Sequence, residues 1–137
     1  MSRRMARRAP RDRGAAAVEF ALLLPMLLLL VFGIIDFGRA LNAQITITQA
    51  AREGARLEAL GQPNVAGRTQ AAATGVSPVT VTITGSCPAG AGPGVNATVQ
   101  VSYAFSFVTP IAALAALFGS SVSSPTLTAT GVMPCET

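Results

Sequence analysis

The chain has 137 residues, of which 50% are apolar and 12% charged, enough for one membrane anchor and one small domain of about 75 residues. Its net charge of +4 is concentrated at the N-terminus: residues 1–14 hold six arginines and one acid (+5), and the remainder holds four arginines and five acids (−1). Nucleic-acid binding needs a basic patch on the folded part, so this distribution argues against a nucleic-acid partner.

Residues 15–35 form an apolar run in which Glu19 is the one charged residue. At about 1.5 Å per residue, this run spans roughly 30 Å, the thickness of a bilayer core. A cleaved secretory signal is the alternative, but its apolar region is usually about 7–15 residues long and ends in a cleavage site, and no convincing site follows here. The sequence therefore predicts a basic leader at 1–14 and a transmembrane helix at 15–35.

Pro25 lies inside this predicted helix. Proline removes a backbone donor, which frees the carbonyl of Ala21 and permits a bend, and such a residue is better tolerated in membrane helices than in soluble ones. Pro25 is therefore either a functional kink that helps the helix to repack or a harmless one.

The arginines of the leader place the N-terminus in the cytoplasm, because basic residues next to a membrane segment tend to stay inside. Everything after Ile35 is then extracytoplasmic, in an oxidising compartment where disulfides persist. Cys87 and Cys135 are the two cysteines of the chain. A bridge between them would close a loop of about 49 residues and contribute roughly 4 kcal/mol; two free thiols are the alternative.

Residues 36–62 continue the helical pattern beyond the membrane, because no proline interrupts them before Pro63. Gly61 is placed to cap this helix, with proline following it. The pattern predicts one long helix from Ala15 to Leu60, of about 69 Å.

Residues 63–137 are expected to form a small β-rich domain. The sequence predicts a short helical piece at 65–74, a loop at 85–94 and three strands, at 79–84, 95–108 and 126–133. The first two strands should pair as an antiparallel hairpin, since no crossover helix separates them. The expected fold class is α+β, with a long N-terminal helix covered by an antiparallel sheet.

A short apolar helix is expected after Thr109 and Pro110, with the threonine as cap and the proline in the first turn. Its sequence, IAALAALFG, contains no polar side chain. We expect this helix to fill the core beside the long helix; the alternatives are that it lies on the membrane or on a partner subunit.

The sequence offers little equipment for catalysis. It contains no histidine and no lysine, and its glycine-rich loop lacks the lysine and following helix of a phosphate-binding loop. Without a base, none of the serines or threonines is an activated nucleophile. We therefore expect no enzymatic activity, no cofactor, no metal and no small-molecule substrate.

The segment GAAAVEFALLLPMLLLLVFGIIDFGRALNAQITITQAAREGAR resembles the TadE-like family, pseudopilin-type membrane proteins of the Tad (Flp) pilus and secretion apparatus. The resemblance covers about Asp12 to Arg56 and implies a pilin-like plan. It also implies cleavage by a prepilin peptidase between Gly14 and Ala15. Glu19 and Phe20 would then serve subunit assembly, with the carboxylate of Glu19 compensating the new amine of a neighbouring subunit.

The resemblance further implies a single-pass protein of the inner membrane that can be incorporated in a pilus. Its partners would be the prepilin peptidase, other pilin or pseudopilin subunits and the inner-membrane platform proteins of the Tad system. A fibre subunit and a membrane-resident assembly factor both fit. A different class of function also stays open, namely an exported or membrane-anchored β-rich binding or sensor module with an ordinary signal-anchor.

Overall fold

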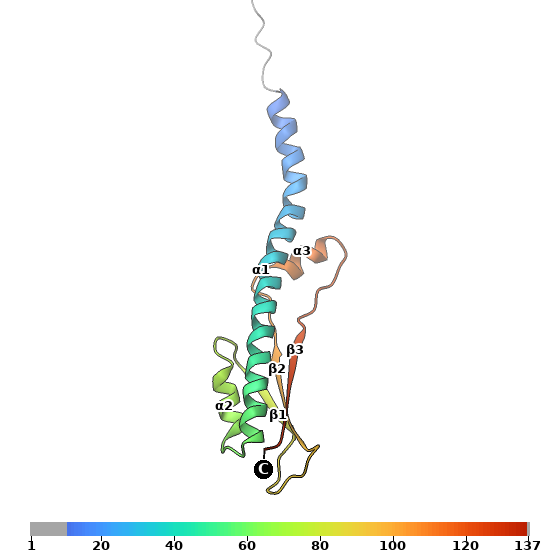
Figure 1. Ribbon diagram of the computed structural model, residues 1–137. Coiled ribbons are helices and arrows are strands. Elements are labelled where there is room, and N and C mark those ends of the chain that lie inside the picture. Colours follow the sequence, from blue (N-terminus) through green and yellow to red (C-terminus); the bar gives the residue numbers. More distant parts are fainter. Residues whose placement is uncertain (1–10, 137) are drawn as a thin grey trace, which may run out of the picture.

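The computed structural model describes residues 11–136, and the side chains of residues 14–136. Residues 1–10 of the predicted leader lie outside the described part. The elements, in chain order, are α1 (Arg11–Ala59), α2 (Val65–Ala72), β1 (Val79–Gly85), β2 (Asn96–Ala104), α3 (Ile111–Leu117) and β3 (Thr126–Pro134). Figure 1 shows α1 as a rod whose N-terminal half projects beyond a small α+β domain that packs on its C-terminal half.

The long helix predicted from the sequence is confirmed. α1 contains 49 residues and runs through Pro25 without interruption, so its length is about 74 Å at 1.5 Å per residue. The helix ends where the glycine signal predicts. Gly61 has φ +61°, the N–H of Gly61 donates to Glu58 O at 3.0 Å, and the N–H of Gln62 donates to Leu57 O at 2.9 Å. These two bonds satisfy the last carbonyls of the helix in the way of a Schellman motif.

The three strands form one antiparallel sheet in the order β1-β2-β3. Val101 in the central strand pairs with Val81 of β1 and with Ala129 of β3, which puts apolar side chains side by side on one face. The predicted hairpin between the first two strands is therefore confirmed, as is the α+β fold class.

The core lies between this face of the sheet and one stripe of α1. The stripe has helical spacing and consists of buried residues, namely Ala43, Ile47, Ala51 and Ala55. Val99 and Val101 of β2 face it and are fully buried. Three alanines in the stripe allow the sheet to approach the helix backbone closely, because their side chains end at Cβ.

Gly131 marks a very close approach of β3 to α1. A Cβ built at Gly131 would overlap the carbonyl group of Ala51. Any residue other than glycine at this point would push the strand away from the helix. The α+β domain is thus fixed directly to the backbone of the same helix that carries the apolar N-terminal half.

Two sequence expectations differ from the structure. β2 ends at Ala104 and does not continue to Val108, because the chain turns there toward α1. The apolar helix α3 does not fill the core: Ala115 is its one buried residue, and Leu117 is 75% exposed. In Figure 1, α3 lies to one side of α1, between the sheet and the free N-terminal half of that helix.

Candidate functional site

The N-terminal part of α1 has no cover from the rest of the described chain. All residues from Gly14 to Leu24 are exposed, with Phe20 at 63% and Leu22 at 75%. The most apolar stretch of this helix has a mean hydropathy of 2.7, is long enough to cross a membrane, and is not buried within the protein. Such a surface needs lipid or other apolar helices around it.

The residues predicted for processing and assembly lie on this free part. Gly14 and Ala15 are exposed, and a Cβ at Gly14 would meet nothing within 4 Å. Glu19 is also exposed and lies four residues after Ala15, so both residues occupy the same helix face about one turn apart. Among the side chains described, none forms a salt bridge with Glu19. Their roles in cleavage and assembly stay predictions.

A cluster of polar contacts surrounds Asp36, the residue that directly follows the predicted membrane segment. Among the side chains of α1 that are described, from Gly14 onward, Asp36 is the first buried one, with 2% exposure. Its carboxylate accepts hydrogen bonds from the N–H of Val108 at 3.1 Å, from the N–H of Thr109 at 3.3 Å and from the Thr109 hydroxyl. Arg39, one turn later, donates to the same carboxylate at 3.2 Å. We call these four residues the junction.

The junction explains why the second strand does not extend to Val108, as the sequence predicts. The backbone N–H groups of Val108 and Thr109 bond to Asp36 on the helix and not to a neighbouring strand. The expected cap of α3 by Thr109 is wrong for the same reason, because its hydroxyl bonds to Asp36; Pro110 is the N-cap residue and makes no side-chain cap.

These hydrogen bonds also set the charge state of the carboxylate. The hydroxyl of Thr109 lowers the pKa of Asp36 most, and the backbone N–H groups and Arg39 lower it further against the opposing effect of desolvation. Asp36 is therefore ionised at neutral pH despite its burial, as a carboxylate with several donors can be.

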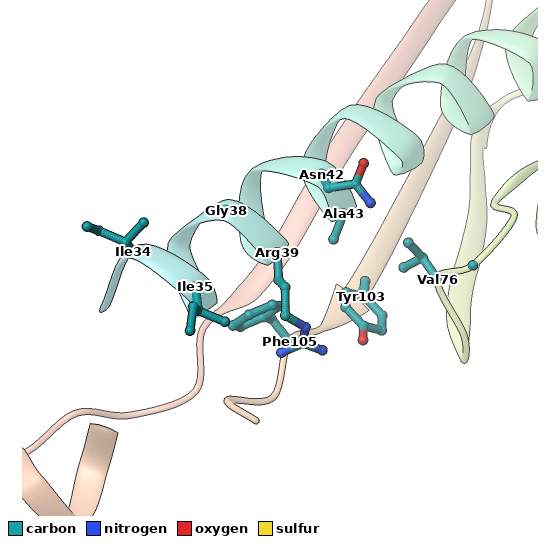
Figure 2. A pocket seen from close by; sticks show the side chains of 10 residues that line it. Ile34, Ile35, Gly38, Arg39, Asn42, Ala43, Val76, Tyr103 and Phe105 are labelled. Carbon is teal, nitrogen blue, oxygen red and sulfur yellow. The ribbon is translucent and has the colours of Figure 1, made fainter. Parts of the chain in front are cut away.

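Arg39 connects the junction to the sheet. Its guanidinium donates to the carbonyl of Ser106 at 3.3 Å and lies over the ring of Phe105, 5.4 Å from the centroid. Figure 2 shows this side chain reaching toward Phe105. Arg39 and Phe105 border an open groove of about 400 Å³. Six residues of α1 between Ile34 and Ala43 line the groove, together with Gly75, Val76 and Tyr103. Since Arg39 is already paired, the groove offers no free charge to a ligand.

Sequence reasoning did not find the junction. In the sequence, Asp36 and Arg39 are distinguished only by their place after the apolar run, and the Thr109-Pro110 pair predicts a helix start. One feature of the sequence could have indicated the junction: a carboxylate directly after a membrane segment needs hydrogen-bond donors if it is buried. The position of its donors, 72 and 73 residues later in the chain, could not be inferred from local pattern.

The predicted disulfide is present. Cys87 and Cys135 are bonded, with Cα atoms 5.6 Å apart. The bridge connects the loop after β1 to the end of β3, next to the C-terminal end of α1, where the N–H of Glu136 donates to Ala59 O at 3.4 Å. Across residues 11–136, no group of three His, Cys, Asp or Glu side chains lies close enough to hold a metal ion.

These features define a class of protein: a small disulfide-bonded α+β domain on a long N-terminal helix whose exposed apolar half is suited to anchoring the chain in a membrane. Residues 14–56 match the sequence model of the family described as TadE-like protein. The resemblance inferred from the sequence is thereby confirmed, over about a third of the chain. The chain matches no curated protein and no solved structure.

Proposed function

We propose that this protein is a TadE-like pseudopilin, a non-catalytic component in the assembly of a Tad (Flp) pilus. In this proposal α1 spans the inner membrane with its N-terminus in the cytoplasm. The observation that carries the membrane part is the change in burial along α1. Every side chain from Gly14 to Leu24 is exposed, and the first buried one, Asp36, directly follows the predicted membrane end at Ile35.

The proposal assigns cleavage to the bond between Gly14 and Ala15. This bond lies at the first residue of the family match and at the start of the exposed apolar stretch, in reach of a protease in the membrane. The arginines of the leader would hold it at the headgroups, by about 1 kcal/mol each. Cleavage frees an amine on Ala15, and Glu19 of one subunit then pairs with the amine of its neighbour.

An apolar stripe supports contact between subunits beyond the membrane. Phe37, Leu41 and Ile45 follow one another at helical spacing after the predicted membrane end, with exposures of 66%, 49% and 57%. They continue the face of Leu30 and Ile34. In water such a stripe is unfavourable, so its natural cover is the matching helix of another pilin or pseudopilin subunit. The platform proteins of the Tad system are further partners in this proposal.

The mass of the mature protein tests the proposal. The full chain, produced together with a prepilin peptidase and extracted from membranes, should begin at Ala15. Replacement of Gly14 by leucine should leave the unprocessed form in the membrane. Gly38→Leu is the matched control, because Gly38 is also exposed on α1 with nothing near its Cβ position, and should be processed normally.

Two results would contradict the assignment. Normal processing of the Gly14→Leu variant would show that the cut lies elsewhere. A mature protein that has lost everything through about Ala43 and does not sediment with membranes would identify an ordinary export signal, and the chain would then be a secreted binding module.

A further inference from the structure

α3 is an apolar helix that the described part of the protein leaves largely uncovered. Its seven residues and the following Phe118 are all apolar. Leu117 is 75% exposed, Phe118 60% and Val108, just before the helix, 70%. No charged residue occurs in the sequence between Arg68 and Glu136. Exposed apolar groups gathered in one short segment indicate an interaction surface.

The position of α3 along α1 identifies what that surface meets. Ile111, the first residue of α3, packs on Gly33, where its Cδ1 lies 3.8 Å from the Cβ position of the glycine. Gly33 is inside the predicted membrane segment, two residues before its end. The junction holds Val108 and Thr109 on Asp36, immediately outside that end. α3 is therefore fixed at the depth where α1 leaves the bilayer.

Backbone groups at the C-terminal end of α3 and just before the helix are satisfied within the protein. At the C-terminal end of α3, the N–H of Gly119 donates to Ala116 O and that of Ser120 to Ala115 O, each at 3.0 Å, which closes the helix in a Schellman motif. Before the helix, the N–H groups of Val108 and Thr109 are taken by Asp36. Backbone groups near lipid have to be satisfied internally in this way.

We propose that α3 is a second membrane contact, which inserts into the interfacial region of the leaflet from which α1 emerges, with Leu117 and Phe118 among the acyl chains. The occupant is lipid, because the surface of α3 adjoins the lipid-facing surface of α1 at Gly33 and contributes no charge that would have to be desolvated. Figure 1 shows α3 extending sideways from α1, as expected for a helix in the membrane plane. The serines at 120–124 then lie at the headgroups.

This inference depends on the proposed membrane span of α1 and on no other part of the proposed function. It adds a physical consequence: one helix through the bilayer leaves the domain free to rotate and tilt, whereas a second contact to one side of α1 fixes the orientation of the sheet relative to the membrane surface.

Tryptophan fluorescence can test the contact, because the chain has no tryptophan. Three single-tryptophan variants of the full chain are placed in nanodiscs of phosphatidylcholine, one copy per disc. Leu117→Trp probes α3, Leu30→Trp is the reference within the span, and Val132→Trp is the control on β3; these positions are 75%, 60% and 56% exposed, so each accepts the larger ring. Lipid brominated near the headgroup end or near the middle of the acyl chain then quenches each tryptophan according to its depth.

Leu117→Trp should be quenched, and more strongly by bromine near the headgroup end, since an interfacial helix lies only about 5–10 Å into the headgroup and acyl boundary. Val132→Trp should keep its full intensity. Quenching of Leu30→Trp but not of Leu117→Trp overturns the inference and leaves the membrane span intact. Absence of quenching at both positions overturns the span, and the proposed function with it.

Two further results would also overturn the inference. Quenching of Val132→Trp as strong as that of Leu117→Trp would show that the whole domain lies on the bilayer without a specific role for α3. Emission from Leu117→Trp that moves to shorter wavelength only with two copies per disc, without quenching by brominated lipid, would identify a second copy of the chain as the cover.

Discussion

Asp36 and Thr109 are joined by two hydrogen bonds, from the backbone N–H and from the hydroxyl of the threonine to the same carboxylate oxygen. This pair connects the point where α1 leaves its apolar half to the start of α3. Replacement of Asp36 by asparagine removes the charge and one acceptor, so the amides of Val108 and Thr109 should exchange with deuterium faster. Hydrogen exchange of the full chain in nanodiscs measures this, with Glu136→Gln as the control for loss of an exposed carboxylate.

The hydrogen bonds to the carboxylate of Asp36 should depend on pH. The pKa of Asp36 is lowered from its ordinary value of 3.8, chiefly by the Thr109 hydroxyl. The stability it contributes is therefore fully present above 3.8 and is lost as the pH falls through the lower pKa of the folded state. Protection of the Val108 and Thr109 amides should decrease in that acidic window.

The pKa of Glu53 is also lowered from its ordinary value, because Arg56 donates hydrogen bonds to its carboxylate. The Asp36→Asn variant should lose the pH dependence at Val108 and Thr109, whereas Glu53→Gln should keep it. An equal response in both variants would show that the acid effect is general and does not arise at the junction.

The close packing of Gly131 against α1 predicts that its replacement strongly destabilises the domain. Its replacement by alanine places a methyl group against the carbonyl of Ala51, so β3 has to move and the cost should be about 1–3 kcal/mol. Gly92→Ala is the matched control, because a Cβ there meets nothing within 4 Å and the residue is exposed. Its effect should stay within about 0.5 kcal/mol. Thermal unfolding followed by circular dichroism compares the two, and equal melting temperatures would contradict the close packing.

The disulfide predicts sensitivity to reduction. Its cysteines are 48 residues apart in the chain, so loss of the bridge should destabilise the domain by about 4 kcal/mol on the loop-entropy estimate. The double variant Cys87→Ala, Cys135→Ala should melt at the temperature of the reduced native chain and should not respond to reductant. A native chain whose melting temperature is unchanged by reductant would contradict a stabilising role.

Glu19 predicts a defect in assembly without a defect in insertion. The Glu19→Gln variant keeps the shape of the side chain and removes its charge, so the amine of a neighbouring subunit would enter the helix bundle unpaired. The variant should reach the membrane in normal amount. Its association with other pilin-type subunits, measured by crosslinking in membranes, should fall about tenfold or more, which corresponds to a loss of about 1.4 kcal/mol or more. Normal association would show that the carboxylate is incidental.

Local pattern was sufficient for most of the fold. The alternation of Val99 and Val101 with polar residues predicted a strand with one buried face, and both side chains are fully buried. Gly61 and Pro63 predicted the end of α1 to within one residue. These features depend on spacing and on glycine or proline geometry, which the sequence states directly.

The parts that were mispredicted depend on contacts between distant residues. Phe105 and Phe107 continue the alternation of β2, but the sheet stops at Ala104. The N–H of Phe105 donates to Pro125 O, and those of Val108 and Thr109 donate to Asp36, 72 and 73 residues earlier in the chain. The composition of α3 indicated burial, but this helix lies outside the core, with Leu117 75% exposed. The crossing of Gly131 over Ala51 could not be predicted from the sequence either, since a lone glycine in a strand has no distinctive pattern.

α1 is continuous from Arg11 to Ala59 with Pro25 inside it, and its C-terminal half is part of the core of the domain. A pull or a twist applied to the domain is therefore transmitted along α1 as far as Pro25 without passing through a loop. Conversely, any turn of the part of α1 after Pro25 about its own axis swings the sheet by the same angle, so the packing of that part dictates which side the domain presents to its surroundings.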